Sequence, residues 1–162
     1  RMRGERLSFL VEKERGALAR SPTDPGIKIR LASLLRRAGR PQEALEHLAF
    51  HSDDEKLMKL RAFELASCRE AQGDLLAGIE VLRSFDAPPS LSSEDREILY
   101  KLALLYERMG DLGGAASALR RAILSSGEKG ETRARLEELY RRIVVQGLRG
   151  GARVIEERSR IV

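Results

Sequence analysis

Residues 99–123 read LYKLALLYERMGDLGGAASALRRAI, and they decide the fold because they contain two amphipathic helices and a tight turn. One face of the first helix repeats at spacings of three and four, the period of an α-helix, and carries Leu99, Leu102, Ala103 and Tyr106. Gly110 ends this helix, because glycine readily adopts the left-handed conformation that closes one. Asp111 is a good N-cap for the second helix, whose apolar face carries Ala115, Leu119 and Ala122. The stretch is therefore predicted to be a helical hairpin.

The same pattern recurs twice earlier in the chain. A leucine and an alanine stand eight and seven residues before each of three turn glycines, as Leu31-Ala32 before Gly39, Leu65-Ala66 before Gly73 and Leu102-Ala103 before Gly110. Five and nine residues after these glycines come a small residue and a leucine: Ala44 and Leu48, Gly78 and Leu82, Ala115 and Leu119. The first two glycines are 34 residues apart and the next two 37. Self-similarity at this period predicts an array of helix-turn-helix repeats.

These residues resemble the tetratricopeptide repeat (TPR) family, whose motif has the large-small pair, the turn glycine and a small residue early in the second helix. The resemblance covers residues 24–127 as three repeats. It implies an all-α fold, a right-handed superhelix or α-solenoid of stacked helix-turn-helix repeats with capping helices.

The chain is expected to form a single TPR-like domain over residues 1–162, because solenoids need polar-faced helices at both ends. The expected parts are an N-terminal capping helix at 1–23, repeats at 24–57, 58–92 and 93–128, a C-terminal capping helix at 129–148, and a tail or linker at 149–162. Gly150 and Gly151 are predicted to break the last helix. The start Arg1-Met2-Arg3 suggests a fragment of a longer protein.

Composition fits a helical domain with a core of leucine and alanine. Hydrophobic residues make up 42% of the chain and charged residues 34%, but aromatic residues only 4%. No apolar run is long enough for a signal peptide or a membrane span, so no membrane association is expected. Cys68 is the single cysteine, which excludes an intrachain disulfide and predicts a reducing, cytoplasmic location.

Candidate chemical groups are few. His47 and His51 are four residues apart on a predicted helix, but a metal site needs three or four ligands. His51 also stands where the other repeats carry Phe85 and Ala122, so it is interpreted as a packing residue. Neither paired carboxylates nor a nucleophile with its base stands out. The chain is therefore interpreted as non-enzymatic, without a metal or a cofactor.

The favoured function is a protein–protein interaction scaffold that holds a peptide or helix of a partner in a concave groove. The resemblance implies that one side of each first helix lines this groove, namely Ile29, Arg30, Ser33 and Arg36, then Phe63, Glu64, Ser67 and Glu70, then Tyr100, Lys101, Leu104 and Glu107. Some family members clamp a partner's terminal carboxylates with Lys, Asn and Arg there. Because Ile29, Phe63 and Tyr100 stand in a row instead, we expect no carboxylate clamp. The predicted partner is an amphipathic helix or an apolar segment, with Phe63 and Tyr100 as its anchors.

Charge leaves other interpretations open. The net charge is +5, with basic ends at residues 1–40 and 117–162 and an acidic middle. A basic helical-repeat binder of nucleic acid is one alternative, although the middle is acidic and stacking aromatics are scarce. A regulatory or assembly domain of a larger enzyme is another. The tail at Ile161-Val162 could enter the acidic middle of a second copy and give a weak homo-oligomer, or the charges could simply solvate the surface.

Overall fold

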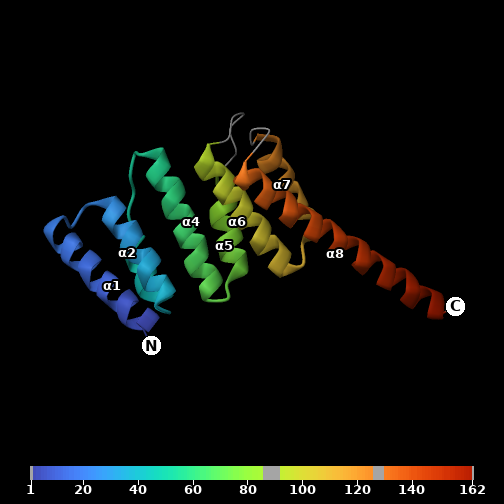
Figure 1. Cartoon of the computed structure of the whole chain (residues 1–162), viewed down its shortest axis with the longest axis horizontal. Helices are drawn as coiled ribbons and strands as arrows, with labels where there is room; N and C mark the ends of the chain where they lie inside the picture. The colour runs from blue at the N-terminus through green and yellow to red at the C-terminus, as the bar shows by residue number, and fades with distance from the viewer. Residues whose placement is uncertain (1, 86–91, 126–129, 162) are drawn as a thin grey trace. The chain divides into compact units, whose positions relative to one another are not determined.

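The computed structural model describes residues 2–85, 92–125 and 130–161, and within these ranges it contains eight α-helices and no strand (Figure 1). The chain divides into two compact units, Arg1–Asp86 and Ala87–Val162. The helices of unit 1 are α1 (Met2–Arg20), α2 (Pro25–Arg37), α3 (Pro41–His47), α4 (Glu55–Ala71) and α5 (Leu75–Arg83). The helices of unit 2 are α6 (Ser93–Met109), α7 (Leu112–Ser125) and α8 (Glu131–Ile161). The predicted all-α class is confirmed.

The helices begin where local sequence provides a cap. Asp24 caps α2, because its Oδ1 accepts hydrogen bonds from the backbone N–H groups of Gly26 and Ile27 at 2.8 and 3.2 Å. Ser92 and Asp95 form a reciprocal capping box at the start of α6. Both caps use the short polar side chains that N-cap positions favour.

The three turn glycines have the backbone conformation that the repeat requires. Gly39, Gly73 and Gly110 have φ angles of 77°, 80° and 81°, in the left-handed region that favours glycine. After Gly110, Asp111 Oδ1 accepts a hydrogen bond from Gly114 N at 2.8 Å and so starts α7. The reversal of the chain between the two helices of each hairpin is therefore encoded by nearby residues.

Small residues allow the two helices of each hairpin to approach closely. Helix α2 packs on α3, α4 on α5 and α6 on α7, and the small residues of the motif are all buried, namely Ala32, Ala44, Ala66, Gly78, Ala103 and Ala115. In unit 1, Val11 of α1 joins the core cluster around Leu31 and Leu35, so α1 packs on α2. The core is mostly leucine and alanine, as the composition predicts.

The prediction that His51 is a packing residue on a helix was wrong. Helix α3 ends at His47, and the His51 side chain is 81% exposed in the loop that follows. Phe50 takes the inner position instead, where Lys28 and Arg61 lie 5.6 and 5.7 Å from its ring centroid. Arg61 Nε also donates a hydrogen bond to the carbonyl oxygen of Leu48 at 2.6 Å, which satisfies the short helix's end.

The predicted break at Gly150 and Gly151 was also wrong, because α8 continues through both. Neither glycine has a positive φ, and a glycine inside a helix costs only about 1 kcal/mol relative to alanine. No proline follows to end the helix. The tail's apolar end, Ile161-Val162, lies outside the side chains that the structure describes.

Candidate functional site

The predicted contact residues of α2 lie in three different environments. Ile29 is buried in the core cluster of unit 1, Ser33 and Arg36 are half-buried, and Arg30 is exposed. Arg30 Nε donates to Glu14 of α1 at 3.4 Å. Most of these α2 side chains are thus at least half-buried, and the charge of the exposed Arg30 is paired with Glu14.

An ion pair joins α2 to α4. Arg36 Nε donates to Glu64 Oε2 at 3.1 Å, and both side chains are largely buried. Since each partner neutralises the other, neither carries an uncompensated charge for a ligand. Two of the predicted groove residues, Arg36 and Glu64, therefore bind each other.

A stripe on α4, which we call the α4 stripe, consists of Leu60, Phe63 and Ser67. Leu60 is 39% exposed, Phe63 is half-buried and Ser67 is buried. Ser67 Oγ donates to the Phe63 carbonyl oxygen at 2.9 Å, so its hydroxyl is used within its own helix. Leu60 was missed in the sequence analysis, although it stands one helical turn before Phe63. Glu70, on the next turn, is half-buried.

In unit 2 the equivalent face of α6 contacts α8. The predicted residues Tyr100, Lys101, Leu104 and Glu107 are all half-buried. The Arg135 guanidinium lies 4.3 Å from the Tyr100 ring centroid, and its Nη2 donates to Glu97 Oε1 at 2.6 Å. One face of the tyrosine ring is therefore covered from within the unit.

A second arginine of α8 also reaches α6. Arg142 Nη2 donates to both carboxylate oxygens of Glu107, at 3.1 and 2.8 Å. Arg135 and Arg142 are seven residues apart, two helical turns, and so lie on one side of α8. This spacing could have identified them, but their partners on α6 are too distant in sequence to infer.

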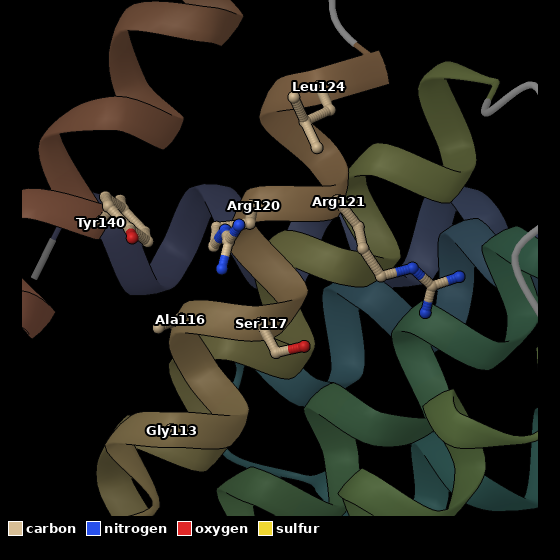
Figure 2. Close-up of a pocket in the computed structure, with 7 residues that line it drawn as sticks. All are labelled: Gly113, Ala116, Ser117, Arg120, Arg121, Leu124 and Tyr140. Atoms are coloured by element: carbon tan, nitrogen blue, oxygen red, sulfur yellow. The ribbon is translucent and has the colours of Figure 1, made fainter.

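A separate hollow lies between α7 and α8 (Figure 2). Its volume is about 340 Å³, and it is lined by Gly113, Ala116, Ser117, Arg120, Arg121, Leu124 and Tyr140. Tyr140 faces Arg120 across the hollow (Figure 2). Sequence analysis did not indicate this hollow, because it depends on how α8 packs on α7.

The side chains of the described residues that could act as a nucleophile or as metal ligands are not grouped into a site. Burial raises the pKa of the Cys68 thiol to about 11, so the thiol is protonated at neutral pH. No three His, Cys, Asp or Glu side chains are grouped as metal ligands among the described residues. Nor is any helix in these residues both long and apolar enough to cross a membrane.

Comparison with protein families identifies the hairpin of unit 2. Residues 97–125 match the tetratricopeptide repeat family, from within α6 to the end of α7. Helices α6 and α7 are thus similar to a tetratricopeptide repeat. The match supports a TPR-type repeat protein and confirms the resemblance seen in the sequence. No curated protein and no solved structure matches the chain. Tetratricopeptide repeats are in general non-catalytic, and the repeat suggests a protein–protein interaction scaffold.

Proposed function

We propose that this chain is a non-catalytic scaffold that binds an amphipathic helix or an apolar segment of a partner protein on the first helices of its hairpins, in the cytoplasm. The observation that carries the proposal is the α4 stripe. Leu60 is exposed and Phe63 is half-buried one turn later, so an apolar leucine and an aromatic ring adjoin on one helix face.

The polar groups around the α4 stripe favour an apolar ligand. The Ser67 hydroxyl is bonded to its own helix, and Arg36 and Glu64 are bonded to each other. A partner that covers this surface therefore has few unsatisfied polar groups to desolvate. Phe63 is the proposed anchor, because aromatic side chains bury a large area and dominate binding energy at interfaces.

The remaining predicted groove residues have supporting roles in the proposal. Ile29 supports α2 by packing in the buried core of unit 1 and does not contact the partner. Tyr100 is the proposed anchor of unit 2 through the part of its ring that Arg135 leaves uncovered. Because Glu107 is bonded to Arg142, the Arg142 guanidinium is already engaged by a carboxylate of its own unit. A peptide with an acidic C-terminus should therefore bind weakly, and Lys101→Ala should leave its affinity unchanged.

A capture experiment tests the proposal. The whole chain, its Phe63→Ala variant and a Leu76→Ala control are used to capture proteins from extract of the source cell, with and without nuclease treatment. Leu76 is a suitable control because it is an exposed apolar residue on α5, a second helix. We expect the same protein partners with the unaltered chain and the control, and their loss with Phe63→Ala. Equal capture by all three chains, or binding that disappears with the nuclease, would contradict the proposal.

A further inference from the structure

The α7 side of the hollow between α7 and α8 is a stripe of residues on which a second helix could pack. Its α7 residues lie on one stripe at steps of three and four, from Gly113 to Leu124, which spans roughly 16 Å. The first turns of this stripe carry only small side chains, Gly113, Ala116 and Ser117. Small residues let a second helix approach closely, because its ridge of side chains can enter the groove they leave.

One end of the hollow and its far side carry an apolar and an aromatic side chain. Leu124 of α7 is 81% exposed, and Tyr140 of α8 is half-buried on the opposite side. After Tyr140, Val144 and Leu148 follow at steps of four along α8 and are 37% and 70% exposed. A row of apolar side chains thus continues from the hollow along α8.

The hollow is basic. Helix α7 contains no aspartate or glutamate, and both of its arginines, Arg120 and Arg121, line the hollow and are exposed. Neither has an ion-pair partner among the described residues. By contrast, Arg135 and Arg142 of α8 are paired with Glu97 and Glu107. Charge complementarity therefore calls for carboxylates on the molecule that fills the hollow.

From these three observations we propose that the hollow binds an acidic amphipathic helix of a partner protein. Its apolar face would lie between Leu124 and Tyr140, and its carboxylates would pair with Arg120 and Arg121. The site is distinct from the α4 stripe, so it would give the scaffold a second docking surface. A nucleic acid fits less well, because two arginines neutralise few phosphates and the rest of the lining is small or apolar.

The test uses a defined peptide and the whole chain. The peptide is a lactam-bridged helix of about 14 residues, an ordinary helix length, with leucine and alanine on one face and glutamate on both flanks. Its affinity is measured by fluorescence anisotropy with the unaltered chain, Arg120→Glu, Ser117→Trp, Arg83→Glu and Phe63→Ala. Arg83 is a matched control because it is an exposed arginine in the last turn of a second helix, in unit 1.

We expect Arg120→Glu to weaken binding at least about tenfold, since it replaces an attraction by a repulsion. Ser117→Trp should weaken it similarly by filling the hollow, while Arg83→Glu should leave it within about twofold. Phe63→Ala should have no effect, which separates this site from the one proposed above.

Four results would overturn the proposal. They are no binding of the glutamate peptide, equal binding of a version with lysine in place of glutamate, equal loss with Arg83→Glu, and loss with Phe63→Ala alone. Displacement of the peptide by a single-stranded oligonucleotide, with binding of that oligonucleotide itself weakened by Arg120→Glu, would assign the hollow to nucleic acid instead.

Discussion

The guanidinium of Arg135 on α8 lies over the ring of Tyr100 on α6, 4.3 Å from its centroid, while it donates to Glu97. This contact makes α8 part of unit 2 rather than an appendage, because it joins the third helix of the unit to the first. Arg142 and Glu107 repeat the connection two turns further along α8.

The Tyr100–Arg135 contact should be measurable as a coupling energy. In a double-mutant cycle of Tyr100→Leu and Arg135→Ala, the two effects on the free energy of unfolding should differ from additivity by about 0.5 to 1 kcal/mol, the range for a partly exposed cation–π pair. Urea unfolding of the four chains gives this value. The same cycle with Arg141→Ala, an exposed arginine of α8, should be additive. Additivity for both cycles would show that the contact does not stabilise unit 2.

The core of the hairpin in unit 2 should be sensitive to volume in both directions. Leu102 is buried, so Leu102→Ala should cost about 2 to 5 kcal/mol by leaving a cavity. Ala103 is fully buried where α6 meets α7, so Ala103→Leu should cost about 1 to 3 kcal/mol by overpacking. Leu124→Ala should change stability by less than about 0.5 kcal/mol, because that leucine is exposed. Unchanged urea midpoints for the first two variants would refute this packing.

Two glycines three residues apart should respond oppositely to the same substitution. Gly110 has a φ of 81°, so Gly110→Ala should destabilise unit 2 by about 1 kcal/mol or more. Gly113 lies in the first turn of α7, where an added Cβ would be 3.7 Å from Asp111 Oδ1, an ordinary contact. Gly113→Ala should therefore stabilise by about 0.5 to 1 kcal/mol through helix propensity. Thermal unfolding compares the two variants, and a shift in the same direction for both would contradict the turn geometry.

Features that depend on nearby residues could be predicted from the sequence. The turn at Gly110, the cap at Asp24 and the close approach at Ala103 each follow from a spacing of a few residues. The inward position of Phe50 rather than His51 could not be predicted, because it depends on Lys28 of α2 and Arg61 of α4.

The candidate sites show the same division. Leu60 and Phe63 share a helix face by periodicity alone, and the omission of Leu60 was avoidable. The cover of Tyr100 by Arg135 joins residues 35 positions apart, and no local pattern reveals such a pair. The hollow between α7 and α8 likewise depends on packing. The sequence of α7 does not show which of its side chains α8 leaves exposed.

The most direct test of the interaction scaffold is the affinity of its captured partner segment, measured by calorimetry with the unaltered chain, Phe63→Ala, Tyr100→Ala and Leu76→Ala. We predict that each of the two aromatic substitutions weakens binding at least tenfold, about 1.4 kcal/mol, while circular dichroism stays helical and Leu76→Ala binds normally. Normal binding by both Phe63→Ala and Tyr100→Ala would contradict the proposed role of the first helices.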